Sequence, residues 1–142
     1  MAYNYKERKI VALLADGLEL WQAMNALGHM ATALGANKDA ELMGRDLLID
    51  KTGNRHLGIA RYGFIIKKAD RNSVKEAIVA MKPNPKVITA DFPREMLDTG
   101  HDDELAGSIA LKDHNDFDYL GAIFYGPTAE IDKLTKKFDL WK

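Results

Sequence analysis

Apolar and polar positions along the chain change their spacing in a regular order, which predicts strands and helices in turn. Lys9–Leu14 is a short apolar run with β-branched residues, and Asp16-Gly17 after it is a turn signal. From Leu20 to Asn37 the apolar residues recur at helical spacing. The inner side of this helix is expected to carry Leu20, Ala23, Met24, Leu27, Met30, Ala31 and Leu34, and the other side Gln22, Asn25, His29 and Thr32.

The segments that follow predict one hairpin of two strands and three further strands. Asp46–Asp50 and His56–Ile59 flank the turn residues Thr52-Gly-Asn54, which favours a hairpin. Further strands are expected at Tyr62–Ile66, Lys86–Ala90 and Tyr119–Tyr125. The strand at Lys86–Ala90 should stop near Asp91-Phe-Pro93.

Three more helices are expected between and after these strands. One is capped by Asn72 or Ser73 and points Val74, Ile78 and Met81 inward. Another begins with the spacing of a capping box, from Thr99 to Asp102, and carries an apolar face of Leu105, Ile109 and Leu111. The last follows Gly126-Pro127 with an inner stripe of Ile131, Leu134 and Phe138. Alternating strands and helices predict an α/β sandwich with helices on both faces of the sheet.

Composition narrows the class of protein. With 142 residues and no internal linker, the chain is expected to form a single α/β domain over residues 1–142. It has no cysteine, its net charge is -1, and its N-terminus has no apolar segment of signal-peptide length, so we expect a cytoplasmic protein without a membrane span. No phosphate-binding loop or dinucleotide motif follows a strand, and Thr99 to Asp103 lacks the spacing of helix-borne zinc motifs. We therefore predict neither a cofactor nor a metal site.

The first helix stands out because no Asp, Glu, Lys or Arg occurs from Leu20 to Asn37, although 29% of all residues are charged. A polar but uncharged helix face suits a groove, where hydrogen-bonding groups are useful and a full charge is costly to desolvate. Gln22, Asn25 and His29 are therefore candidate binding residues, and Trp21 is placed to wall a groove or a subunit contact. Burial of the same residues beneath another element or a partner is the alternative, and both interpretations stay open.

Two separated segments resemble a known family. Asp16 to His29, with the strand before it, and Tyr119 to Leu140 both resemble the domain-of-unknown-function 2000 family. That family is similar in fold to type 2 peptidyl-tRNA hydrolases, in which an Asp-Leu turn opens the first helix and a buried strand ending in Gly-Pro leads into an Ile-Asp-x-Ile/Leu-Thr helix. The resemblance implies a three-layer α/β/α sandwich around a mixed sheet of about four strands, often dimeric.

The resemblance also implies candidate catalytic residues. Gln22 occupies the position of the hydrolases' active-site lysine, and a neutral amide cannot supply the lysine's positive charge. The hydrolases' Asp-Ala-Gly-Arg-Thr element corresponds either to Asp98-Thr-Gly-His-Asp102, where Thr99, His101 and Asp102 follow the Asp, or to a site centred on Asp91. His29 matches directly, and its ordinary pKa of about 6.5 suits acid–base chemistry near neutral pH.

Three functions remain open on these grounds. The first is binding of a small polar ligand in a groove formed by Gln22, Asn25 and His29 with Asp91 or the segment from Asp98 to Asp102. The second is hydrolysis of the ester between peptide and tRNA, with His29 and Asp98 or Asp91 as the participants. The third is a homodimeric interaction module without turnover, in which the uncharged helix face is a protein contact.

Overall fold

The computed structural model describes residues 4–142; the first three residues of the N-terminal segment, over which no signal peptide is expected, lie outside this range. Strand β1 (Arg8–Ala15) lies at the centre of a five-stranded sheet with the order β5-β6-β1-β4-β7. It pairs parallel with β4 (Gly63–Ala69) and antiparallel with β6 (Tyr119–Pro127), which makes the sheet mixed. Strands β5 (Ile88–Pro93) and β7 (Asp139–Leu140) form its edges.

The sheet has one strand more than the sequence indicates. The extra strand is β7, which pairs with β4 through Lys67 and Lys68. It comprises only Asp139 and Leu140, and an element of two residues is too short to show an alternating pattern. The mixed α/β class is as predicted, and the number of strands is corrected from about four to five.

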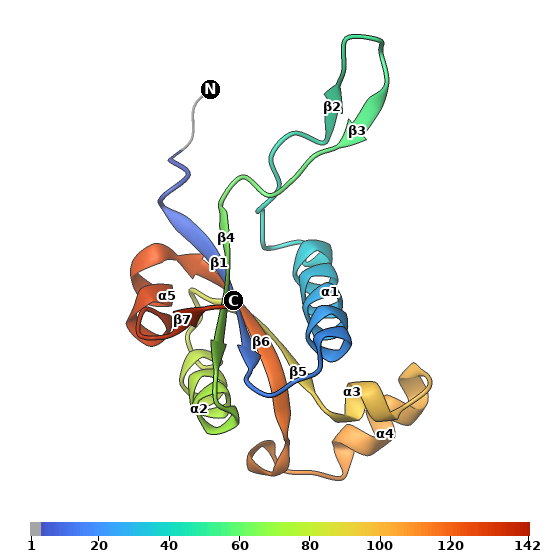
Figure 1. The fold of residues 1–142 in the computed structure, drawn as a ribbon, viewed down its shortest axis with the longest axis vertical. Helices are drawn as coiled ribbons and strands as arrows, with labels where there is room; N and C mark the ends of the chain where they lie inside the picture. The colour runs from blue at the N-terminus through green and yellow to red at the C-terminus, as the bar shows by residue number, and fades with distance from the viewer. Residues whose placement is uncertain (1–3) are drawn as a thin grey trace.

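Helices cover both faces of the sheet (Figure 1). Helix α1 (Leu20–Ala36) packs on one face, where Ile10, Ala12 and Leu14 of β1 belong to its core cluster. Helices α2 (Arg71–Met81) and α5 (Thr128–Thr135) pack on the other face, against Val11, Leu13 and Ala15. Because β1 is buried on both faces, it reads as a continuous apolar run and not as an alternating one.

The inner side of α1 differs from the expectation at three positions: Ala26 is buried without having been expected there, and Leu20 and Met24 are exposed. Ala23, Ala26, Met30 and Leu34 are its buried residues, whereas Leu20 is 66% and Met24 64% exposed. Met24 follows Ala23 directly and is turned about 100° from it around the helix axis. Leu20 is the first residue of the helix, where α1 has not yet come over the sheet. The outer surface of α1 is therefore partly apolar as well as uncharged.

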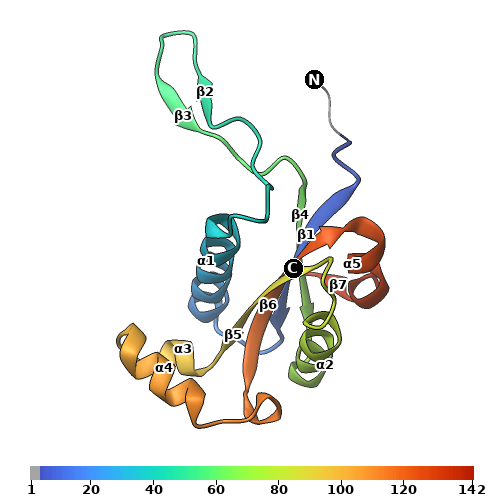
Figure 2. The same cartoon turned by 180° about the vertical axis from the view of Figure 1, so that it is seen from behind.

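Strands β2 (Leu47–Ile49) and β3 (Arg55–Leu57) form the expected hairpin, which is a separate two-stranded sheet. Its turn is closed by Asp50, whose Oδ1 accepts hydrogen bonds from the backbone N–H groups of Thr52 and Asn54. Figure 2 shows the hairpin projecting away from the three layers, beyond the C-terminal end of α1. We call residues 42–61, which comprise this hairpin and its stem, the arm.

The N-terminal cap of helix α2 differs from the expectation. Helix α2 is capped by Asp70, not by Asn72 or Ser73: its Oδ1 accepts a hydrogen bond from the Ser73 backbone N–H at 2.9 Å. Its inner residues Val74, Ile78 and Met81 are buried as predicted. Asp70 directly follows β4 and directly precedes α2. Because no loop separates the strand from the helix, the hydrophobic pattern does not mark where the helix begins.

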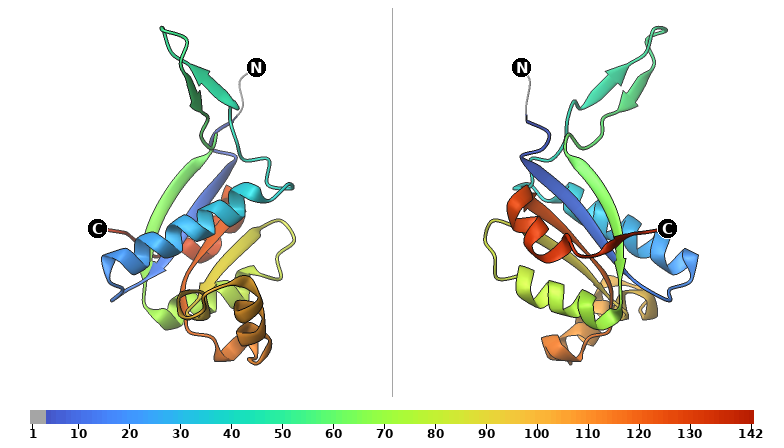
Figure 3. Two further views of the ribbon diagram at one scale, coloured as in Figure 1. Left: turned by 90° about the vertical axis from the view of Figure 1, so that its right-hand side faces the viewer. Right: turned by 60° about the vertical axis from the view of Figure 1, so that its left-hand side comes forward.

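The crossover from β5 to β6 contains a short helix that the pattern does not reveal. Helix α3 (Glu95–Asp98) precedes α4 (Asp102–Ala110), and the 3-10 helix η1 (His114–Asp116) follows. The expected apolar face of α4 stops at Ile109, because Leu111 lies beyond the helix and is 87% exposed. Figure 3 shows α3 and α4 at the end of the molecule opposite to the arm. Within residues 4–142, no helix is both long and apolar enough to cross a membrane.

Candidate functional site

A pocket of about 310 Å³ lies where α1, the end of β5, α3 and α4 meet. Its lining joins one residue of the first helix to residues roughly seventy positions further along the chain: His29, Phe92, Met96, Thr99, Gly100, His101, Asp102 and Leu105. The sequence places His29 and the segment from Asp98 to Asp102 in one candidate groove. His29, Thr99, His101 and Asp102 are the members of that set that line this pocket.

His29 enters the pocket from the exposed side of α1. Its imidazole ring lies 5.9 Å from the ring of Phe92, measured between centroids, at an interplanar angle of 31°. Phe92 is 1% exposed and belongs to the core cluster beneath α1. Both imidazole nitrogens of His29 lack a hydrogen-bond partner among the described residues, which leaves them available to a ligand.

His101 lies on the opposite wall and caps α4. Its Nδ1 accepts a hydrogen bond from the Glu104 backbone N–H at 3.3 Å, so the ring proton belongs on Nε2 in the neutral imidazole. In return the Glu104 carboxylate accepts a hydrogen bond from the Gly100 backbone N–H at 3.2 Å. These two bonds fix the loop before α4, and His101 Nε2 lies 3.9 Å from Oε2 of the same Glu104 carboxylate.

Thr99 does not cap α4, contrary to the expectation from its spacing with Asp102. Its hydroxyl donates to the Glu95 carbonyl oxygen at 2.8 Å and so closes the end of α3. The unpredicted helix α3 comes between β5 and α4 and captures this side chain. The Thr99 oxygen keeps lone pairs that a donor in the pocket can use.

An ion pair holds α3 to the far end of α4. Glu95 is 6% exposed, and Lys112 Nζ lies 2.8 Å from its Oε1. The hydrogen bond to the Glu95 carboxylate raises the pKa of Lys112 above its ordinary value. This contact secures the pair of helices that forms one wall of the pocket.

Asp91 and Asp98, the two alternatives for the hydrolases' Asp, both lie outside the pocket. Asp91 points to the opposite face of the sheet from Phe92, because neighbouring residues of a strand face opposite ways. There its carboxylate lies 2.5 Å from Lys82 Nζ, at the end of α2. Asp98 is exposed at the end of α3 and lies 3.7 Å from Arg94 Nε. Neither carboxylate lines the pocket with His29.

The remaining candidates of α1 lie at its first two turns. Gln22 Oε1 accepts a hydrogen bond from the Glu19 backbone N–H at 3.1 Å, and the Glu19 side chain caps the helix in return. The Trp21 indole N–H donates to the Glu19 carboxylate at 2.6 Å. Asn25 is exposed one turn before His29, on the same side of the helix. Gln22, Trp21 and Asn25 do not line the pocket, and Gln22 has a structural role at the helix start.

The pocket has residues that sequence reasoning did not name as a site. Phe92, Met96 and Leu105 supply its apolar floor. The sequence predicts Leu105 on the inner face of its helix and Phe92 near the end of its strand, but it gives no indication that the two residues lie close together. Met96 lies on α3, a helix that the hydrophobic pattern does not predict.

Asp102 supplies a carboxylate to the lining of the pocket. The first turn of α4 carries Asp102, Asp103 and Glu104, whereas the helix dipole contributes only about half a positive charge there.

Among residues 4–142, no group of three His, Cys, Asp or Glu side chains comes together in the way that would hold a metal ion.

The fold and the pocket define a mixed α/β protein with a two-histidine pocket between its first helix and the crossover from an edge strand. The chain belongs to the family described as "Protein of unknown function (DUF2000)", whose match covers residues 8–142. The resemblance drawn from Asp16 to His29 and from Tyr119 to Leu140 is thereby confirmed at the level of the family.

A solved structure has the same fold. The protein of unknown function Atu0240 from Agrobacterium tumefaciens strain C58 is similar with a TM-score of 0.83 and 21% sequence identity, over 96% of this chain and 98% of that one. At this identity the likeness concerns the fold alone. A comparison with curated proteins gives no match.

Proposed function

We propose that the pocket between α1 and the α3–α4 crossover binds a small molecule that pairs an apolar group with a hydrogen-bond donor, above all an amine. The observation that carries this proposal is the meeting of His29 with His101 and Asp102 over the buried ring of Phe92. A carboxylate, a hydroxyl oxygen and a free imidazole accept hydrogen bonds from such a group. The apolar floor of Phe92, Met96 and Leu105 accepts the rest of the ligand.

The sign of the charge favours an amine over an anion. A ligand carboxylate or phosphate would meet Asp102, with Asp103 and Glu104 in the same helical turn. Neither His29 nor His101 carries a permanent charge to offset this repulsion. The neutral Gln22 leaves the first helix without a cation as well.

A pair of probes of equal size tests this proposal. Benzylamine and benzoate share a phenyl ring and carry opposite charges, so NMR titration of each separates apolar contact from charge recognition. We expect the imidazole protons of His29 and His101 to shift with benzylamine, with a Kd on the order of 1 mM, and to respond to benzoate far more weakly. His29→Ala should weaken benzylamine binding, and equal binding of both probes would overturn the proposal.

The proposed kinship of the fold with type 2 peptidyl-tRNA hydrolases gives the competing function. It is supported by the position of the two resembling segments: β1, which leads into α1, pairs directly with β6, which leads into α5. Hydrolysis of peptidyl-tRNA by the protein, lost in His29→Ala, would replace the ligand-binding proposal. The Asp102 carboxylate in the pocket and the absence of a cation on α1 favour the small ligand.

A further inference from the structure

The arm exposes apolar side chains that the rest of the chain does not cover. Leu57 is 82%, Ile59 75% and Ile49 60% exposed, and Met43 and Leu48 are nearly half exposed. A hairpin of two short strands is marginally stable by itself in water, and apolar side chains on it are costly. This segment is therefore suited to packing against another surface.

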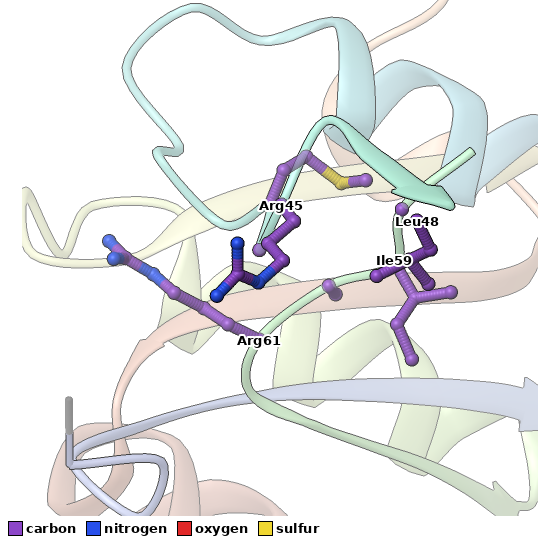
Figure 4. A pocket seen from close by; sticks show the side chains of 8 residues that line it. Arg45, Leu48, Ile59 and Arg61 are labelled. Atoms are coloured by element: carbon purple, nitrogen blue, oxygen red, sulfur yellow. The ribbon is translucent and has the colours of Figure 1, made fainter. Parts of the chain in front are cut away.

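The stem of the arm forms a groove of about 550 Å³ with a basic and an apolar side. Figure 4 shows the Arg45 and Arg61 guanidinium groups toward one end and Leu48 and Ile59 toward the other. Backbone hydrogen bonds hold the stem together, among them Gly44 N–H to the Ile59 carbonyl oxygen at 2.8 Å. The Arg61 guanidinium also donates to the Glu41 carbonyl oxygen at 2.9 Å, which fixes its direction.

A complementary surface lies on the same side of the sheet. Helix α4 has no fully buried residue and begins with three acidic residues, whereas Leu105 lines the ligand pocket and Ile109 packs against the chain's own core. The acidic first turn of α4 matches a groove with two arginines in charge. The chain thus carries both halves of one contact.

The outer face of α1 lies between these two surfaces. Figures 1 and 2 show the arm beyond one end of α1 and the α3–α4 pair at the other, all on the same side of the sheet. This outer face has Leu20, Trp21 and Met24 more than half exposed and no charged residue. An uncharged apolar face does not repel a second copy of itself.

The exposed area also favours a partner. The chain exposes 9147 Å², whereas a compact monomer of 15.9 kDa exposes about 7300 Å². The excess is larger than the roughly 800 Å² that each partner buries in a standard interface. The arm is the segment that departs most clearly from a compact shape (Figure 3).

From these observations we infer that a second copy of this chain binds here as a two-fold symmetric dimer. The groove of each arm receives α4 of the other copy, and the outer faces of the two α1 helices meet between these contacts. With a two-fold axis near the middle of α1, the arm of each copy lies opposite α4 of the other copy. The contact between arm and α4 therefore forms twice in the dimer. The inference goes beyond the proposed ligand and does not depend on it.

Charge reversal across the two surfaces tests this arrangement by sedimentation velocity over low to high micromolar concentrations. The wild type should be dimeric at the upper end. Arg45→Glu and Asp103→Lys should each raise the dimer Kd about tenfold, and the double variant should return to within about threefold of the wild type. Arg45 lies on the arm and does not line the ligand pocket, so Arg45→Glu should keep benzylamine binding.

Two further variants complete the test. Lys51→Glu makes the same charge change as Arg45→Glu but at the tip of the arm, and it should leave the dimer Kd unchanged. Met24→Glu adds charge to the outer face of α1 without touching the core and should yield a monomer with an unchanged circular dichroism spectrum. A monomeric wild type, a double variant no better than the singles, or a dimer that tolerates Met24→Glu would each overturn the inference.

Discussion

The rings of His29 and Phe92 lie 5.9 Å apart between centroids and are tilted by 31°, although His29 belongs to an uncharged stretch of the first helix and Phe92 lies near the end of an edge strand. The contact joins the exposed side of α1 to the core beneath it. Phe92 supports the imidazole of His29 from below and also forms part of the pocket floor. Packing and candidate chemistry therefore depend on the same aromatic ring.

Phe92→Ala should lower both stability and ligand binding. Phe92 is 1% exposed, and truncation of a buried phenylalanine costs about 3–5 kcal/mol of unfolding free energy. Urea unfolding followed by tryptophan fluorescence measures this loss. Phe92→Leu keeps most of the apolar volume and should cost clearly less, and equal costs for both variants would contradict the packing described for this residue.

Asp91→Asn should separate stability from binding. It removes the charge that faces Lys82 on the opposite side of the sheet, and a loss of about 1 kcal/mol is expected because Lys82 stays partly exposed to water, with its side chain 44% exposed. The benzylamine shifts of His29 should be unchanged. Asp102→Asn is the matched change inside the pocket and should weaken benzylamine binding, so a loss in Asp91→Asn instead would place the site on the other face.

Tyr119 should ionise only at strongly alkaline pH. Burial, with a smaller contribution from the Asp91 and Glu95 carboxylates, raises the pKa of Tyr119 to about 12. A raised pKa means that the neutral phenol stabilises the fold below the ordinary pKa of about 10 and that this stability is lost as the pH rises through about 12. The phenolate absorbance of the wild type minus that of Tyr119→Phe should therefore rise near pH 12, while circular dichroism checks the fold. A difference signal centred near pH 10 would be evidence against burial of this phenol.

Gly58→Ala should damage the arm and spare the core. A Cβ atom at Gly58 would lie 1.6 Å from the Arg45 carbonyl oxygen, so the backbone of the stem has to move. We expect the dimer Kd to rise at least tenfold while the unfolding free energy of the sheet changes little. Gly63→Ala is the control, because nothing lies within 4 Å of a Cβ at that position. A Gly58→Ala variant with a wild-type dimer Kd would argue against the role of the stem.

The hydrophobic pattern of the sequence predicts the central strands and helices of the fold, but not its short peripheral elements. Tyr119–Tyr125 and Val74, Ile78 and Met81 are buried as their spacing indicates, because burial of one or both faces imposes a period on the sequence. Helix α3 has four residues and strand β7 two, about one period each, so neither is long enough for a repeating pattern to show. The outward direction of Met24 depends on how far α1 rolls on the sheet, which its own sequence does not specify.

Sequence positions indicate part of the pocket lining where residues lie on one helix or one loop, whereas the rest of the lining depends on tertiary packing. His29, Thr99, His101 and Asp102 do line one pocket. Asp91 was a candidate because it neighbours the end of a strand, yet strand alternation directs it to Lys82. Phe92, directly after it, takes the place beside His29, and that choice between two adjacent residues follows from which face of β5 meets α1.

The most direct test of the central claim is the position of bound benzylamine, measured through intermolecular nuclear Overhauser effects to side-chain protons assigned in the protein. Binding over the pocket floor predicts contacts from the phenyl ring to Phe92, Met96 and Leu105, and none to Leu48 or Ile59 of the arm. Contacts confined to the arm, or none at the pocket in a sample saturated with benzylamine, would contradict the assignment of this pocket as the ligand site.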